Sequence, residues 1–321
     1  MLCVMIRISV GTAKVMGLTD LQIDVLPTTG YFMIGQSCIY DCAFCSQSRT
    51  SHTRSDQLSR VTWPEYDLEQ VMKHLSTTTD REVIRRICLQ VVHQPGIKDT
   101  VQKILHRLSQ SSELPICVCM RVNHVKEAAE LIESGAERVC IALDAANPRV
   151  YEQIKNGSWH NRMKLIEEAA AMFPGHISTH LIVGLGETEK EMVETIQHMY
   201  QIGVTVGLFA FTPIRGTRMS KNPSPPLDQY RRIQVAHWLI RHGICDGSNF
   251  SYKNGSITGF GLSSKELLKH LADGEAFRTS GCPDCNRPYY NERPGGPMYN
   301  YPRPLTPDEI TKAIAELKIK L

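Results

Sequence analysis

From residue 31 to about residue 242, short apolar runs alternate with longer stretches that carry charge on one side. The apolar, β-branched runs predict strands at 31–36, 84–92, 115–121, 137–144, 176–183 and 205–211. The longer stretches predict helices at 64–75, 98–110, 123–134, 187–201 and 225–242. Because strands that alternate with helices pair in parallel through right-handed crossovers, we expect an α/β fold, a partial (β/α)6 barrel.

The predicted strands alternate between an apolar face and a face with sulfur and polar groups. The polar face carries Cys88 and Gln90, then Cys117, Cys119 and Arg121, then Cys140 and Asp144, and finally Ser178 and His180. Helices outside a barrel require apolar residues against them, so the polar face is expected to line the lumen. Such a lumen indicates a cavity with chemistry in it, although a single cysteine such as Cys140 can equally be a small core residue.

The alternation fades beyond residue 243, where Ser, Asn, Gly, Pro and Tyr dominate. A short helix is predicted at 263–272 and a last one at 306–318, with a "GCPDC" segment between them that is interpreted as an ordered lid. The expected organisation is an N-terminal extension (1–30), a barrel (31–258) and a C-terminal extension with cysteines (259–321).

Charge and composition exclude several classes of protein. The chain has 36 basic and 33 acidic residues and no dense basic run, so a nucleic-acid partner is not expected. The run "MLCVMIRISV" is short and interrupted by Arg7, which predicts neither a signal peptide nor a membrane span, and we expect a cytoplasmic protein without a membrane partner. Eleven cysteines, an odd number, favour metal ligands or core thiols over a disulfide framework.

The stretch "SCIYDCAFCSQ" places Cys38, Cys42 and Cys45 within eight residues. Structural zinc sites and completed iron–sulfur clusters usually take four protein ligands, so three thiolates leave one metal position open. The CxxxCxxC spacing, with Phe44 before the last cysteine and a predicted strand before the first, resembles the radical S-adenosylmethionine (SAM) superfamily. The resemblance implies a [4Fe-4S] cluster whose open iron binds SAM and whose electron cleaves it to a 5′-deoxyadenosyl radical.

Other positions extend the resemblance. "HLIVGLGE" is similar to the family's GxIxGxxE motif, with Ile182 and Glu187 retained and His180 where glycine is usual. Asp144 matches the acidic residue that binds the SAM ribose in biotin-synthase-like members, and Arg162 matches the partner of the SAM carboxylate. Alternatively, Asp144 is a helix N-cap and Arg162 a solvated helix residue. The family's Gly-Gly-Glu motif after the second strand is absent, as in the biotin-synthase-like branch.

The same resemblance implies a second, sulfur-donating [4Fe-4S] cluster. Cys88 and Cys119 match two auxiliary-cluster ligands of biotin synthase, whereas Ser178 stands near the position of the third. Cys282 and Cys285 are the candidates that would complete four ligands, with Cys117 as a substitute. Alternatively, the CxxC is a zinc knuckle that closes the C-terminal segment.

The N-terminal stretches "SVGTAKVMGL" and "PTTGYFMIG" and the C-terminal stretch "GCPDCNRPYYNERPGG" together resemble the two-protein lipoyl synthases. In those enzymes, two related subunits each perform one of two sulfur insertions. This resemblance implies that the substrate is an octanoyl group on a lipoyl carrier protein, attacked at C6 or C8, and that the partners are a paralogous subunit and a reduced electron donor. An apolar slot for the chain is expected from Phe209, Phe211, Tyr289 and Tyr290, unless these aromatics serve packing alone.

Two alternatives stay open at this point. The chain is similar enough to other biotin-synthase-like enzymes that biotin synthase itself, a methylornithine synthase or a hydrogenase maturase is the second interpretation. A ferredoxin-like electron carrier would be a different class of protein, but the predicted barrel and the SAM motifs argue against it.

Overall fold

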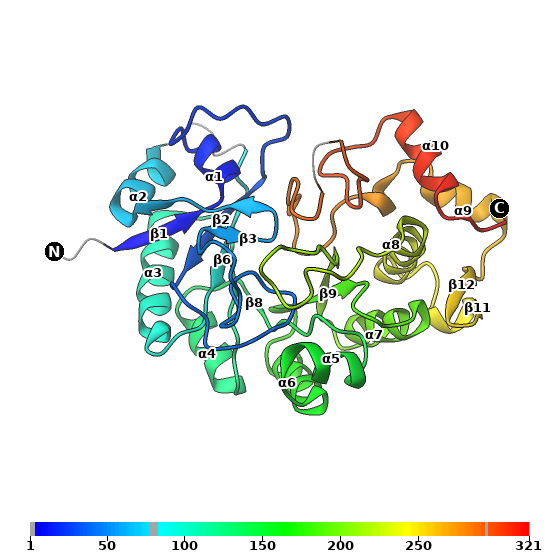
Figure 1. The fold of residues 1–321 in the computed structure, drawn as a ribbon, viewed down its shortest axis with the longest axis horizontal. Coiled ribbons are helices and arrows are strands. Elements are labelled where there is room, and N and C mark those ends of the chain that lie inside the picture. Colours follow the sequence, from blue (N-terminus) through cyan, green and yellow to red (C-terminus); the bar gives the residue numbers. More distant parts are fainter. Residues whose placement is uncertain (1–3, 78–82, 293–294, 321) are drawn as a thin grey trace.

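A parallel sheet forms the body of the molecule in the computed structural model, which describes residues 4–77, 83–292 and 295–320 (Figure 1). Its parallel strands run in the order β10-β9-β8-β7-β6-β2. They are β2 (Thr29–Ile34), β6 (Arg86–Val91), β7 (Ile116–Cys119), β8 (Arg138–Cys140), β9 (Ile177–Val183) and β10 (Thr205–Ala210). Neighbours in the sheet are also neighbours among the predicted strands, which confirms the α/β fold and is consistent with a partial barrel.

Helices connect these strands and cover their apolar face. The predicted ones are α2 (Leu68–Thr77), α3 (Ile97–Ser111), α4 (Val125–Glu133), α7 (Glu189–Gln201) and α8 (Leu227–Arg241). Two further helices, α5 (Pro148–Lys155) and α6 (Trp159–Met172), link β8 to β9, where helices were expected without a defined range. Ile87, Leu89 and Val118 are completely buried under this layer, which confirms the assignment of the outward face.

The N-terminal segment contributes more than an extension. Strand β1 (Met5–Ile8) pairs antiparallel with β2 on one side and with β5 (Glu65–Asp67) on the other, so the sheet has eight strands among the described residues. The predicted helix at 64–75 was therefore wrong at its start: residues 65–67 form a strand and the helix begins at Leu68. A short helix, α1 (Val10–Val15), follows β1.

The C-terminal part is irregular but ordered. It contains the hairpin β11 (Ser251–Lys253) and β12 (Ser256–Gly259), helix α9 (Ser264–Leu271) and helix α10 (Pro307–Ala315). Short 3-10 helices lie at Gly247–Asn249 and Glu275–Phe277. Thr306 and Glu309 form a capping box at the start of α10, which fixes where the last helix begins.

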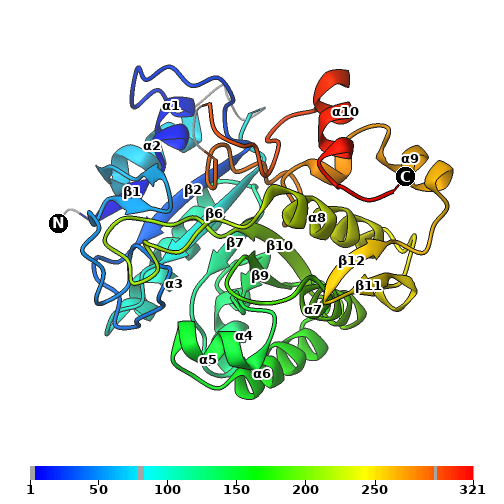
Figure 2. The same ribbon diagram turned by 45° about the vertical axis from the view of Figure 1, so that its right-hand side comes forward.

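Between α9 and α10 the chain returns to the open side of the sheet, and residues 280–292 are called the lid below. On one side the lid binds the free edge of β10, where Ser280 Oγ accepts from the Leu208 amide at 3.0 Å. On the other side Asn286 Oδ1 accepts from the Thr28 amide at 2.9 Å, just before β2. In Figures 1 and 2 this orange segment lies between the blue N-terminal elements and α8. The lid thus bridges the two sides that the partial barrel leaves apart.

Within the described residues, no helix has the length and apolar character needed to cross a membrane.

Candidate functional site

The cysteine loop, residues 37–47, begins directly after β2, at the carboxyl end of the parallel strands. The amide of Ala43 donates to Ile154 O at 2.7 Å, which ties the loop to α5. The Cys45 amide donates to Cys42 O at 3.1 Å, and the Gln47 amide donates to Cys45 Sγ at 3.4 Å. A backbone donor aimed at a cysteine sulfur is the second-sphere contact expected around an iron–sulfur ligand, so the loop fits a three-cysteine cluster site.

The three sulfurs of the loop also influence one another electrostatically. Burial raises the pKa of Cys42, and burial together with the Cys42 thiol raises the pKa of Cys45 to about 12. Cys42 and Cys45 are therefore neutral thiols when nothing cationic is bound. Because metal ligation requires thiolates, loading of this site must release protons.

A cavity of about 170 Å³ lies between the cysteine loop, the strands and the lid. Its walls include the predicted site residues Phe44, Cys45, Cys88, Cys119, Asp144, Ile182, Cys282 and Cys285, together with Cys117 and Ser178. The sulfur-bearing strand face therefore points into the lumen, as the alternation predicted. The cavity brings a cysteine of the loop together with thiols from two strands and from the lid.

The thiols from the strands and the lid form two groups within this cavity. Cys282 Sγ lies 3.9 Å from Cys117 Sγ, and Cys117 is the register partner of Cys88 on the neighbouring strand. Cys119, which was predicted as a ligand beside Cys282, instead interacts with Cys140 and His180. The hydrogen bond from Cys140, and the nearby His180, hold the pKa of Cys119 at about 5.

Polar neighbours reach the first of these groups. Gln90 Nε2 donates to Cys88 Sγ at 3.0 Å, and the hydroxyl of Tyr31 lies 3.3 Å from Cys285 Sγ. Sequence reasoning had placed Gln90 on the lumen face without giving it a role. Tyr31 was missed. It is the first residue of the predicted strand at 31–36, and the register of the sheet places it opposite Cys88.

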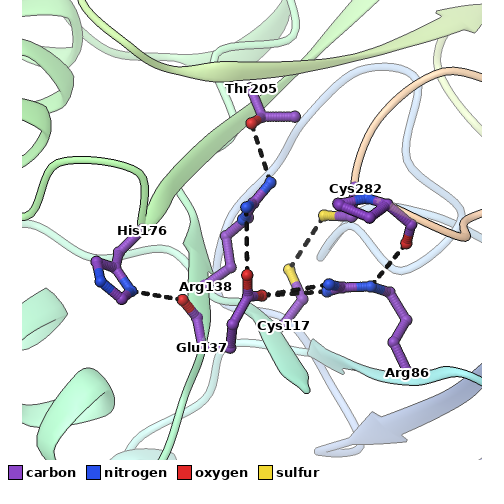
Figure 3. A network of polar contacts seen from close by, with 8 residues as sticks. Arg86, Cys117, Glu137, Arg138, His176, Thr205 and Cys282 are labelled. Atoms are coloured by element: carbon purple, nitrogen blue, oxygen red, sulfur yellow. Dashed lines mark hydrogen bonds and ion pairs between the residues drawn. The ribbon is translucent and has the colours of Figure 1, made fainter. Parts of the chain in front are cut away.

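A network of charged side chains lies at the amino ends of the strands, and Arg86 connects it to the lid (Figure 3). Arg86 donates from Nε to Pro283 O at 2.8 Å and pairs with Glu137 at 3.2 Å, and Arg138 donates to Thr205 Oγ1 at 2.9 Å. Arg86, Arg138 and Thr205 are each the first residue of a strand. The lid cysteines thus enter the barrel from the end opposite the cysteine loop.

Asp144 lies at the wall of the main cavity in a left-handed backbone conformation, with φ 67°. Its carboxylate pairs with Lys155 Nζ at 2.5 Å, and both side chains are at least nine-tenths buried. Burial opposes the charge of the Lys155 amine, but the Asp144 carboxylate, together with Cys42 and Tyr151, outweighs burial and raises the pKa of Lys155. The helix-cap alternative for Asp144 was wrong, because Asn147 caps α5.

Four predicted residues, Cys38, Cys42, Arg162 and Glu187, lie outside the wall of the main cavity. Arg162 is 7% exposed, so the solvated alternative was wrong, and its guanidinium donates to Val122 O at 2.8 Å and to the Tyr151 hydroxyl at 3.4 Å. Glu187 accepts from the amides of Gly184 and Leu185, at 2.7 and 2.9 Å. Glu187 therefore shapes the turn that follows β9. Ile182, which lines the cavity, lies near the end of that strand.

A second cavity, of about 650 Å³, lies against the first. The two share Tyr31, Trp63, Arg287 and Tyr290 as wall residues. Leu21, Ile23 and Val25 of the N-terminal segment line its other side, with Tyr289 of the lid. Of the aromatics expected to form an apolar slot, Phe209, Phe211 and Tyr290 line the main cavity and Tyr289 the second one.

Comparisons with known proteins agree with this architecture. The model of the radical SAM superfamily matches residues 32–199. A biotin synthase from Desulforudis audaxviator is 26% identical over 209 residues, 63% of this chain and 61% of that protein. A lipoyl synthase from Histophilus somni is 24% identical over 189 residues, 56% of this chain and 55% of that protein. The chain thus spans less than two thirds of the length of these two relatives.

Solved structures show the same fold. The FeFe-hydrogenase maturase HydG from Carboxydothermus hydrogenoformans superposes with a TM-score of 0.54 at 16% identity, over 67% of this chain and 52% of that one. Methylornithine synthase (PylB) does so with a TM-score of 0.52 at 13% identity, over 67% of this chain and 62% of that one.

Proposed function

Because this chain belongs to the radical SAM superfamily, we propose that it inserts sulfur into an octanoyl chain carried by a lipoyl carrier protein, as one subunit of a two-protein lipoyl synthase. One observation carries the proposal: the cavity beside the cysteine loop is also lined by cysteines of two strands and of the lid. Such a cavity supplies a radical-generating site and thiols for a sulfur-donating cluster within one enclosed space.

Cys38, Cys42 and Cys45 would hold the [4Fe-4S] cluster of the family, which supplies the electron that cleaves SAM. Asp144 would accept hydrogen bonds from the ribose hydroxyls, since a carboxylate is a suitable acceptor for a diol and this one already lies at the cavity wall. Phe44 and Ile182 would pack beside the bound SAM. Arg162 does not line the cavity, and its Nε and Nη1 are engaged with Tyr151 and Val122, so only Nη2 would be left to pair with the SAM carboxylate.

A second [4Fe-4S] cluster would be held by Cys88, Cys117, Cys282 and Cys285 and would supply the sulfur atom. Cys282 lies beside Cys117 and not beside Cys119, so Cys117 takes the fourth position in place of Cys119; the two thiols, 3.9 Å apart, would move apart to bind different irons. Arg86 and Arg138 lie at the same end of the lumen and would offset part of the negative charge of four thiolates.

The chemistry of the substrate explains why a radical site is needed. A saturated alkyl chain offers no acid, base or electrophile on which polar catalysis could act, so the remaining task of the protein is to orient one carbon. The second cavity, with its apolar side formed by Leu21, Ile23 and Val25, would admit the octanoyl-lysine arm past Trp63 and Tyr290. Phe209 would pack against the chain inside the main cavity. A paralogous subunit would perform the other insertion, and a reduced donor would supply the electrons.

The proposal is tested by an anaerobic assay of the reconstituted chain with an octanoyl-lysine peptide, SAM and a reductant, with and without a related partner subunit. Mass spectrometry is expected to find a peptide with one added sulfur when this chain acts alone. Cleavage of SAM without sulfur on the peptide, under both conditions, would contradict the proposal.

That negative result would favour a second candidate, another biotin-synthase-like radical SAM reaction. The similarity to biotin synthases over 63% of this chain supports this alternative. A full-length Cys282→Ser, Cys285→Ser variant separates the two candidates, because only the lipoyl synthase interpretation requires these cysteines.

A further inference from the structure

Three side chains with metal-binding groups meet in the lumen apart from the cysteines of the loop and the lid. Cys119 ends β7, Cys140 ends β8 and His180 lies on β9, so the group spans three adjacent strands. Cys119 and Cys140 are register partners. The ligand atoms of the three residues all lie within 4.8 Å of one another, and Cys140 Sγ is 3.4 Å from His180 Nε2.

This spacing suits a single ion. A tetrahedral zinc ion with bonds of about 2.3 Å to sulfur and 2.0 Å to nitrogen places those two atoms about 3.5 Å apart. The separation of Cys140 Sγ and His180 Nε2 is close to that value without any bound metal. The cysteines of a four-iron cluster, in contrast, each bind a different iron, so their sulfur atoms do not share one metal ion. Because all three residues come from sheet strands, the ligands are also held in place before an ion binds.

Ser178 provides a separate indication that a ligand is missing. It is the register partner of Cys140 on the neighbouring strand and lines the main cavity, although only 4% of the residue is exposed. Its Oγ is buried and has no hydrogen-bond partner among the residues that the structure describes. A buried hydroxyl without a partner is costly, and an ion in the adjacent thiol and imidazole group would give it one.

We propose that Cys119, Cys140 and His180 bind one zinc-type divalent ion whose fourth position lies toward Ser178. Two thiolates and an imidazole are the ligand types that zinc favours, and three protein ligands leave the fourth position open. The proposed zinc site does not depend on the proposed sulfur insertion. The site is separate from the auxiliary cluster, for which Cys88, Cys117, Cys282 and Cys285 remain.

Metal analysis of the full chain tests the assignment. Anaerobically reconstituted wild type, exposed to limiting zinc and desalted, is expected to hold about one zinc ion per chain. Cys140→Ser is expected to lower zinc occupancy more than about tenfold, with iron and sulfide content unchanged. Cys245→Ser is the matched control, because Cys245 Sγ donates to Phe260 O at 3.0 Å and does not line the cavity. A loss of iron and sulfide in Cys140→Ser would overturn the proposal by assigning this cysteine to a cluster.

Cobalt spectroscopy provides a second test that does not depend on cluster assembly. A full-length variant with Cys38, Cys42, Cys45, Cys282 and Cys285 all replaced by Ala retains the proposed site. One Co²⁺ per chain, with thiolate charge-transfer bands and tetrahedral ligand-field bands, is expected in this variant and should be lost on adding His180→Gln. Circular dichroism checks that each chain is folded. No stoichiometric Co²⁺ binding by the folded variant, or binding that survives His180→Gln but not Cys117→Ser, would overturn the proposal.

Discussion

Cys117 Sγ and Cys282 Sγ lie 3.9 Å apart although 165 residues separate them in the chain. The first belongs to a central strand of the sheet, and the second to the lid that crosses its open side. This contact joins the lid to the barrel through the groups best suited to bind iron.

The lid thiols should be needed for a second cluster but not for the first. In a Cys282→Ser, Cys285→Ser variant we expect a loss of about four irons per chain, because a [4Fe-4S] centre usually takes four protein ligands. SAM cleavage by the cysteine loop should persist, whereas sulfur transfer to the octanoyl peptide should cease. Iron and sulfide analysis and a 5′-deoxyadenosine assay check both parts, with Cys245→Ser as the control. Unchanged iron content would rule out these cysteines as cluster ligands.

Gln90 should tune the potential of that second cluster. Its Nε2 donates to Cys88 Sγ at 3.0 Å, and a donor to a ligand sulfur stabilises the more negative, reduced state. Gln90→Leu removes a hydrogen bond worth about 0.5–1.5 kcal/mol, which corresponds to a midpoint potential lower by roughly 20–60 mV. A redox titration followed by electron paramagnetic resonance measures the shift. Gln110→Leu, on helix α3, should cause none, and an equal potential in wild type and Gln90→Leu would show that Cys88 is not a ligand.

Asp144 should contribute to SAM binding, and Asp144→Asn is the informative change. Asparagine tolerates the left-handed conformation at this position, so the backbone strain of other substitutions is avoided. We expect about tenfold weaker SAM binding in equilibrium dialysis, from the loss of charged hydrogen bonds worth about 1.5 kcal/mol. Because Lys155 then lacks its buried partner, the Asp144→Asn, Lys155→Met double variant is needed. SAM affinity in the double variant equal to that of wild type would argue against a role in binding.

The second cavity should be the route of the acyl substrate. Leu21 is 48% exposed and lines this cavity, so Leu21→Arg places a charge in the route with little effect on folding. The KM for the octanoyl peptide should rise about tenfold, because arginine would put a charge on the apolar side of the cavity that Leu21 forms with Ile23 and Val25. SAM cleavage without the peptide should not change. Leu26→Arg is the matched control, since Leu26 is 38% exposed and does not line the cavity. Equal effects of the two variants would contradict this route.

His237 should make the fold sensitive to acid. Burial lowers the pKa of His237 to about 3, and its Nε2 lies 2.9 Å from the Tyr200 hydroxyl. Between pH 6.5 and about 3 the unfolded chain binds a proton that the folded chain does not, so stability falls as the pH falls. This histidine should account for about 2 kcal/mol of the free energy of unfolding lost between pH 7 and pH 5. In His237→Gln, urea unfolding at pH 7 and pH 5 should show a loss of unfolding free energy that is smaller than in wild type by about 2 kcal/mol. His160→Gln, at an exposed position, should show the same loss as wild type.

The alternation of side chains was enough to predict which cysteines face the lumen, because the period of a strand is a local property. It placed Cys88, Cys117 and Cys119 on one face, and all three line the cavity. Strand β1 was missed because it pairs with β2 and β5, which lie farther along the chain. A local sequence pattern does not show which distant segments pair. The group of Cys140 with Cys119 and His180 was missed for the same reason: each residue lies on a different strand, and only the sheet register joins them.

The position of the lid in the chain affects how the protein is made. Cys45 leaves the ribosome long before Cys282, and the barrel remains open on one side until residues 280–292 bind β10 and the segment before β2. A chain that is still being synthesised therefore leaves its strand cysteines on an open face, and the lid cysteines reach them last. The proposed second cluster, whose ligands include Cys282 and Cys285, would be completed only after this final segment is made.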